Sequence, residues 1–308
     1  MSWRTTLPCT RAEAEAIDAA DDLTIEAVLT TTEVETDDAS RWRLDAYTDD
    51  EPTPELLAAL RALAPSATSE PDIQQLTDDD WIAISQEGLE PIREGRFAVH
   101  TSAHPIDAPE GGRAFLIDAG RAFGTGHHAT TSGCLAMLDA LADRRFGNVI
   151  DFGTGTGLLA FAARWLWPHA RITGTDIDPV AVEVAKVNAE ANGITGVTLL
   201  VADGARSPEI EAAAPYDLLI ANILAGPLSA MAPEIAALAA PHATVILSGL
   251  LTAQADQVVA AWSACGCTPE AQDKRGDWSI LRLTAGEERF VPDGPPDPAG
   301  RDGWALDL

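Results

Sequence analysis

Three glycines at alternate positions follow an apolar run and could form a ligand-binding turn. The stretch extends from Val149 to Leu158, and the glycines are Gly153, Gly155 and Gly157. Glycine lets the backbone turn sharply and approach a ligand closely, while a following helix offers free N–H groups at its N-terminus. A nicotinamide dinucleotide turn has the spacing G-x-G-x-x-G, but here the third glycine comes one residue early. The pattern therefore indicates either a site for another small molecule or a purely structural turn.

Two acids stand at the ends of the next two strand-like segments. Asp176 lies about 20 residues beyond the glycines, which is the distance at which an acid at a strand tip meets ribose hydroxyls. Asp203 follows the third segment and is either a ligand contact or a solvated loop acid. Asp178 precedes Pro179, and we expect it to cap a helix rather than to bind a ligand.

A fully apolar segment ends in Asn222, which opens the string from Asn222 to Leu228. Open α/β sheets bind ligands at the carboxyl ends of their strands. The amide oxygen of Asn222 and neighbouring carbonyls can accept hydrogen bonds from a substrate amine. Asn222 is therefore the candidate catalytic residue, and its structural alternative is a helix cap.

A glycine-containing polar segment, Ala122 to Thr131, precedes the glycine turn. We predict a flexible loop in which Thr130 and Thr131 offer hydrogen bonds to a ligand. His127 and His128 are adjacent, but no acid or cysteine stands at metal-ligand spacing from them. The four cysteines also lack zinc-like spacing. We therefore expect no metal site.

The elements that must position these residues alternate between strand-like and helix-like segments from about residue 128 to residue 284. Strands are expected at 148–152, 171–176, 197–201, 216–221 and 243–248, and helices at 128–142, 157–167, 179–192, from about 227, and at 252–264. This alternation predicts an α/β fold with a parallel, doubly wound sheet. Two closing strands, 268–273 and 278–284, have no helix between them and predict an antiparallel hairpin at the sheet edge.

The chain is predicted to divide into a small α+β domain at 1–75, a linker at 76–96, the sheet domain at 97–285 and a disordered tail at 286–308. The small domain should contain strands at 23–32 and 42–47. It should also contain a helix at 54–63, with Thr53 as its cap and Pro54 in its first turn.

The charge balance is strongly acidic, with 48 acids against 20 bases and a net charge of −28. Binding to phosphate backbones needs clustered Lys and Arg, so direct nucleic-acid binding is not expected. The acidity either keeps the protein soluble or attracts a basic partner. Because the sequence has no apolar run of about 20 residues and no signal-peptide core, we predict no membrane span. We expect a cytoplasmic protein with reduced cysteines, and a monomer is favoured.

The glycine turn resembles the first motif of class I S-adenosylmethionine-dependent methyltransferases, which cradle the methionine end and ribose of that cofactor. The five motifs in their order resemble the PrmA-type ribosomal protein methyltransferases, which trimethylate the large-subunit ribosomal protein L11. The resemblance is carried by Phe123 to Thr131, Ile150 to Gly157, Asp176 to Pro179, and Asn222 to Leu228. It extends from about residue 80 to residue 284 and is weak over 1–75. The family often has Pro where Ala129 stands.

This resemblance implies a Rossmann-like class I methyltransferase domain with an N-terminal substrate-recognition domain. It implies S-adenosyl-L-methionine as the cofactor and a basic protein substrate, ribosomal protein L11, methylated on lysine and N-terminal amino groups. It also implies that Asp203 reaches the adenine amino group. The expected cofactor-binding residues are Thr130, Thr131, Gly153, Gly155, Gly157, Asp176, Asp203 and Asn222. Two alternatives remain open: methylation of another protein or a small molecule, and a non-catalytic cofactor-binding protein.

Overall fold

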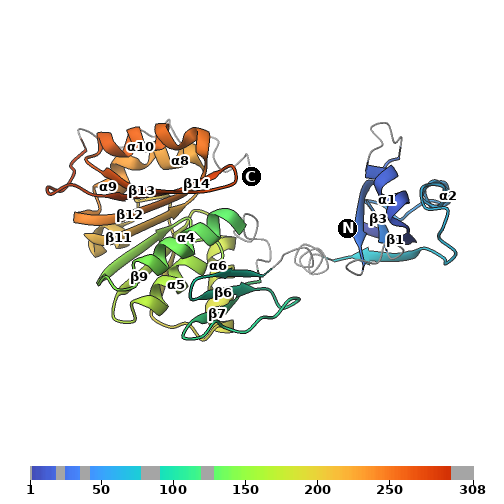
Figure 1. Ribbon diagram of the computed structural model, residues 1–308, viewed down its shortest axis with the longest axis horizontal. Coiled ribbons are helices and arrows are strands. Elements are labelled where there is room, and N and C mark those ends of the chain that lie inside the picture. Colours follow the sequence, from blue (N-terminus) through green and yellow to red (C-terminus); the bar gives the residue numbers. More distant parts are fainter. Residues whose placement is uncertain (1, 19–24, 35–41, 78–90, 119–127, 293–308) are drawn as a thin grey trace. The chain divides into compact units, whose positions relative to one another are not determined.

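A computed structural model describes residues 2–18, 25–34, 42–77, 91–118 and 128–292. The chain divides into two compact units, Met1–Ser85 and Gln86–Leu308, shown in Figure 1. Each unit has its own hydrophobic core. Among the described residues, no helix is long and apolar enough to cross a membrane.

In its described residues, the first unit is an antiparallel sheet with two helices. Its strands pair in the order β2-β3-β1-β4, and its core is built around Leu7, Leu44 and Leu60. The expected helix cap is confirmed, because the hydroxyl of Thr53 accepts the N–H of Leu56 at 3.2 Å. The elements are β1 (Ser2–Cys9), α1 (Arg11–Asp18), β2 (Val28–Glu33), β3 (Trp42–Thr48), α2 (Pro54–Leu63) and β4 (Asp72–Leu76).

The second unit is built on a sheet with the order β10-β9-β8-β11-β12-β14-β13. The first five strands are parallel, and the predicted antiparallel hairpin at the edge is confirmed. The strands are β8 (Asn148–Phe152), β9 (Arg171–Asp176), β10 (Val197–Val201), β11 (Tyr216–Asn222), β12 (Ala239–Leu251), β13 (Thr268–Arg275) and β14 (Trp278–Thr284). The helices are α4 (His128–Ala140), α5 (Leu158–Leu166), α6 (Pro179–Ala191), α7 (Pro208–Ala213), α8 (Ala225–Ala230), α9 (Ala232–Ala236) and α10 (Ala255–Ala264), with a 3-10 turn at Thr252–Gln254.

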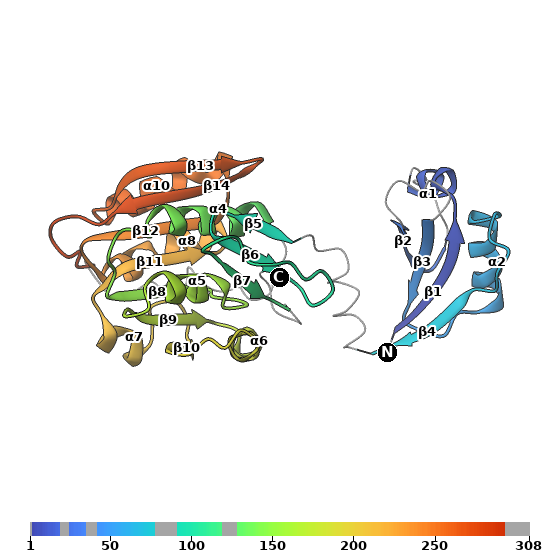
Figure 2. The same cartoon turned by 60° about the horizontal axis from the view of Figure 1, so that its bottom comes forward.

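Helices cover both faces of this sheet, as Figures 1 and 2 show. Helices α4 and α5 pack on the face that carries Val149, Ile220 and Ile246. Helices α8, α9 and α10 pack on the opposite face. Both faces of the central strands are therefore largely apolar, and polar side chains towards the strand ends stand out as candidates for function.

A three-stranded sheet of β5 (Ile92–Glu94), β6 (Phe97–His100) and β7 (Arg113–Leu116) precedes α4. Asn192, just after α6, fixes it by bonding both backbone groups of Leu116, at 2.8 and 2.7 Å. Residues 78–90 of the expected linker lie outside the described residues, as do 293–308 of the expected tail and 122–127 of the expected loop.

Candidate cofactor and substrate site

The glycine turn after β8 has a backbone that only glycine adopts easily. Gly153, Gly155 and Gly157 all have positive φ, at 65°, 52° and 88°. A Cβ on Gly153 would also collide with the side chain of Ile223. The turn leads into α5, whose N-terminus has no side-chain cap. Its amides therefore stand at the carboxyl edge of the sheet, where a ligand's polar groups can approach them.

Asp176 ends β9 and is tied directly to the glycine turn. Its Oδ2 accepts the backbone N–H of Gly155 at 2.9 Å, and its Oδ1 accepts the N–H of Asp178 at 3.0 Å. Burial raises the pKa of the Asp176 carboxyl above its usual value, and the charge of Asp178 adds to that rise. Asp178 is the helix cap that the sequence predicts, because it accepts the N–H of Val180 at 2.8 Å.

Beneath the turn lies Asp151, a buried acid on β8. Its side chain is 1 % exposed, and its Oδ2 accepts the hydroxyl of Thr154 at 2.6 Å. Its Oδ1 is buried without a hydrogen-bond partner. Burial raises the pKa of Asp151 to about 7. Sequence reasoning assigned no role to this acid, although its position two residues before Gly153 was a usable signal.

Asn222 lies at the end of β11, beside β8 on one side and β12 on the other. Its Oδ1 is also buried without a hydrogen-bond partner. Asn222 is in parallel register with Ser248 of β12, whose carbonyl accepts the N–H of Ile223 at 3.0 Å. A Cβ on Gly249 would collide with the backbone of Ile223, so the chain after Asn222 presses closely on β12.

Parallel register places Asp151 and Asn222 on one face of the sheet. Asp151 of β8 is in register with Ile220 of β11, and Asn222 lies two residues after Ile220 on β11. Side chains two apart on a strand share a face. Buried polar atoms normally have partners, so two unpartnered oxygens on one face at the carboxyl edge indicate a place for hydrogen-bond donors from a ligand or water.

Thr130 and Thr131 lie in the first turn of α4 and are 4 % and 6 % exposed. This helix packs over the same sheet face, next to β12 and β14. His127 and most of the predicted loop lie outside the described residues. Among the residues that are described, no group of three or more His, Cys, Asp or Glu could hold a metal ion.

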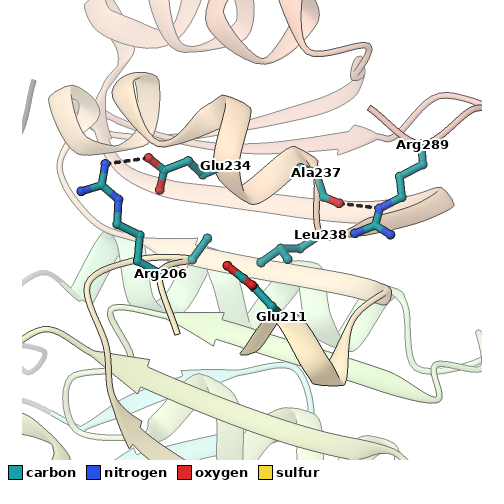
Figure 3. A pocket seen from close by; sticks show the side chains of 7 residues that line it. Arg206, Glu211, Glu234, Ala237, Leu238 and Arg289 are labelled. Carbon is teal, nitrogen blue, oxygen red and sulfur yellow. Dashed lines mark hydrogen bonds and ion pairs between the residues drawn. The ribbon is translucent and has the colours of Figure 1, made fainter. Parts of the chain in front are cut away.

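Asp203 follows β10 and pairs with Arg206 across 3.7 Å. The same guanidinium donates to Glu234 at 3.0 Å. A pocket of about 300 Å³ is lined by Ala205, Arg206, Glu211, Glu234, Ala237, Leu238 and Arg289. Figure 3 shows the Arg206–Glu234 pair at one side of this pocket. None of the glycine turn, Asp176 and Asn222 lines this pocket. Asp203 is thus held by a neighbouring arginine, at the border between the candidate site and a separate surface pocket.

The described residues fit S-adenosylmethionine. The glycine turn leaves room for close approach, Asp176 offers carboxylate oxygens at the tip of the second strand, and Asn222 offers an unpartnered acceptor. Of the predicted residues, the structure brings the three glycines, Asp176 and Asn222 to one edge of the sheet, with Thr130 and Thr131 on the helix that covers one face. Asp203 stands beyond β10, the outermost of the parallel strands.

Comparison with known proteins gives a consistent answer. The family model described as "Ribosomal protein L11 methyltransferase (PrmA)" matches residues 4–285. A protein of Rhizobium meliloti called ribosomal protein L11 methyltransferase is 47 % identical over 211 residues, which are 68 % of this chain and 72 % of that protein. A protein of the same name from Allorhizobium ampelinum is 41 % identical over 261 residues, 83 % of this chain and 89 % of that protein.

A solved structure is similar as well. The crystal structure of the ribosomal protein L11 methylase from Lactobacillus delbrueckii subsp. bulgaricus has a TM-score of 0.56 and 25 % identity, covering 64 % of this chain and 98 % of that one. The family match extends across both units, including residues 4–75, where the motifs give little guidance.

Proposed function

The chain belongs to the ribosomal protein L11 methyltransferase (PrmA) family, and on this premise we propose that it methylates lysine and N-terminal amino groups of ribosomal protein L11. It is a class I methyltransferase, and its cofactor is S-adenosyl-L-methionine. The proposal that the methylated group is an amine rests on the hydrogen-bonding groups of the site, of which Asn222 is the central one.

The unpartnered Oδ1 of Asn222 carries this proposal. A buried amide oxygen without a donor costs free energy, on the order of 1–3 kcal/mol, unless a ligand supplies the donor. A neutral amine has two N–H groups to give while its lone pair attacks, whereas a hydroxyl has one O–H and a carboxylate or thioether has no donor. Asn222 thus suits a nitrogen nucleophile that approaches from the carboxyl edge of β11.

The roles of the chain's residues follow from the geometry. When bound, S-adenosylmethionine supplies an activated methyl group on a positively charged sulfur. Asn222 would accept from the amine's N–H groups and so turn the nitrogen lone pair towards the transferable methyl group. The cofactor would supply that methyl group and keep the electron pair of its broken sulfur–carbon bond as a thioether, and the proton given up by the methylated nitrogen would pass to solvent. Positioning of this kind supplies on the order of 7–11 kcal/mol in well-oriented reactions.

The amine must reach the site in its neutral form. A lysine amine titrates near 10.4 and an α-amine near 8. Burial beneath α4 and the positive charge of the cofactor both disfavour the ammonium form, so each lowers the pKa of the bound amine. Asp151 would oppose this effect only in its ionised form, and because burial raises its pKa to about 7, that form is less populated near neutral pH than for an ordinary carboxyl.

We assign cofactor binding to the residues at the ends of β8 and β9 and on α4. The glycine turn approaches the methionine end, Asp176 accepts from the ribose hydroxyls, and Asp203 accepts from the adenine amino group. Thr130 and Thr131 donate from the covering helix. The complete set is Thr130, Thr131, Gly153, Gly155, Gly157, Asp176, Asp203 and Asn222.

The acidic charge supports a basic protein substrate. A net charge of −28 attracts a basic partner at long range and raises its rate of encounter. The same charge disfavours direct contact with nucleic acid. We further propose that the enzyme acts in the cytoplasm as a monomer; its four cysteines are buried thiols outside any disulfide, which suits a reducing compartment.

The test is to incubate the purified chain with labelled S-adenosylmethionine and ribosomal protein L11 and to map the label by mass spectrometry. Label on lysine and N-terminal amines is the expected result. If L11 stays unlabelled and another protein or a small molecule accepts the label in the same assay, that acceptor replaces L11 as the proposed substrate. Cofactor binding without transfer to any amine would favour the non-catalytic alternative, and the Asn222→Ala variant serves as the low-turnover control.

A further inference from the structure

A hydrogen-bonded cluster outside the candidate site joins three segments that lie far apart in the sequence. Arg275, at the end of β13, donates from Nη1 to Oε2 of Glu94 at 2.5 Å and to the hydroxyl of Ser132 at 2.6 Å. The Ser132 hydroxyl donates to the same Glu94 oxygen at 2.6 Å. Asp273 accepts from Arg275 Nε at 2.8 Å. One guanidinium thus connects the edge hairpin, α4 and β5.

The cluster is charged and largely withdrawn from solvent. The side chains of Arg275 and Glu94 are 26 % and 24 % exposed. Burial raises the pKa of Glu94, but hydrogen bonds from Arg275 and Ser132 outweigh it, so the pKa lies below its usual value. The hydrogen bond to Glu94 in turn raises the pKa of Arg275. Removing one partner from such a pair leaves the other charge poorly solvated, so the cluster resists opening.

Ser132 places this cluster against the start of α4. It directly follows Thr130 and Thr131, which are buried in the first turn. The next residue, Gly133, packs so closely on β14 that a Cβ would lie 2.5 Å from Cγ1 of Ile280. Consecutive residues of α4 are therefore fixed by two different contacts, one polar and one steric.

We propose that Arg275 and Glu94 are positioning residues for the cofactor site. They hold the first turn of α4 in the orientation that presents Thr130 and Thr131 to S-adenosylmethionine. Neither residue contacts the cofactor itself. The inference rests on the proposed function, because it takes those two threonines as cofactor contacts.

The first experiment compares Arg275→Ala with Arg282→Ala. Arg282 is a matched control: it lies on the same hairpin, is 27 % exposed, and pairs with Glu270 at 3.2 Å. We expect Arg275→Ala to raise the Kd for S-adenosylmethionine about tenfold, the size expected for a lost hydrogen bond to a charged group. Hydrogen exchange of residues 128–134 in the cofactor-free protein should also accelerate. Arg282→Ala should change neither quantity.

Two further variants keep the test valid if Arg275→Ala folds poorly. Arg275→Lys should restore part of the affinity, because an ammonium can still pair with Glu94. Ser132→Ala should cause a smaller loss, because it leaves the Arg275–Glu94 pair intact. Full affinity in all three variants, with hydrogen exchange in α4 unchanged, would overturn the positioning role.

The outcome also separates this inference from the proposed function. A wild-type chain that does not bind S-adenosylmethionine would overturn both. The positioning role alone would be overturned by a different result. In that case the wild-type chain binds the cofactor and methylates L11, and Arg275→Ala differs from it only by a loss of thermal stability equal to that of Arg282→Ala.

Discussion

Gly155 donates its backbone N–H to Oδ2 of Asp176 at 2.9 Å, so the glycine turn is tied to the tip of the neighbouring strand. The bond occupies one lone pair of that oxygen and orients the carboxylate, whose remaining lone pairs can accept from a diol. The acid that meets the ribose and the turn that meets the methionine end are therefore one preorganised unit. This link makes the two motifs interdependent.

Removing the Asp176 carboxylate should therefore weaken cofactor binding strongly. We expect Asp176→Ala to raise the Kd for S-adenosylmethionine by roughly 10- to 100-fold, because hydrogen bonds to a charged group contribute about 1.5–3 kcal/mol. Isothermal titration calorimetry measures the effect. The control is Asp178→Ala, which removes only a helix cap worth about 1 kcal/mol of stability. Equal affinity in both variants would contradict the assignment.

Gly153→Ala should disturb the site beyond the ordinary penalty for its backbone. Gly153 and Gly193 have nearly equal φ, 65° and 62°, but only Gly153 has a neighbour in the way, Ile223. Gly193→Ala should cost about 1–2 kcal/mol of unfolding free energy from backbone strain alone. Gly153→Ala should cost about 1–3 kcal/mol more and reduce cofactor affinity. Urea unfolding with cofactor titration distinguishes them, and equal losses would show that Ile223 moves aside freely.

Asn222→Ala should affect turnover far more than cofactor affinity. Loss of one preorganised hydrogen-bonding group lowers kcat by roughly a hundredfold or more. Steady-state kinetics with L11 and a cofactor titration separate the two effects. Asn148→Ala is the control, because Asn148 bonds the carbonyls of Ala213 and Pro215 at the start of β8, the opposite end of the strand from the site. Unchanged turnover in Asn222→Ala would remove this residue from the mechanism.

The central elements could be predicted closely from the sequence, because apolar β-branched runs between glycines and prolines have few alternatives. The expected strands 148–152, 171–176 and 278–284 match β8, β9 and β14 residue for residue. The helix expected from about 227 is instead two short helices, α8 and α9, because Pro233 has no N–H to continue the first.

Other features depend on pairing that one sequence does not reveal. Strand β1 is not predictable from its residue pattern, because it contains Pro8. This residue pairs with Arg43 of β3 but lies beyond the part of β1 that pairs with β4, so its missing N–H costs little. Asn222 and Asp176 were recognisable from their places after strands. The link of Arg275 to Glu94 was not, because 181 positions separate the two residues.

The buried Asp151 should give the protein an identifiable pH dependence. Burial raises its pKa from 3.8 to about 7 in the folded protein. Between these values the folded state binds more protons than the unfolded chain, so this contribution to stability is present at low pH and is lost as the pH rises towards 7. Asp151→Asn stays uncharged, so its unfolding free energy relative to wild type should rise between about pH 4 and about pH 7 and level off above that range. Parallel pH profiles for the two proteins would contradict the raised pKa.

Deleting residues 1–77 should separate cofactor binding from protein methylation. The second unit has its own core on both faces of its sheet, so it should fold and bind S-adenosylmethionine without the first. The first unit has a separate core and carries none of the proposed cofactor or catalytic residues, which suits a role in holding the protein substrate. We expect the truncated chain to keep its cofactor Kd and to lose transfer to L11. A truncated chain that methylates L11 at the full rate would show that the second unit alone selects the substrate.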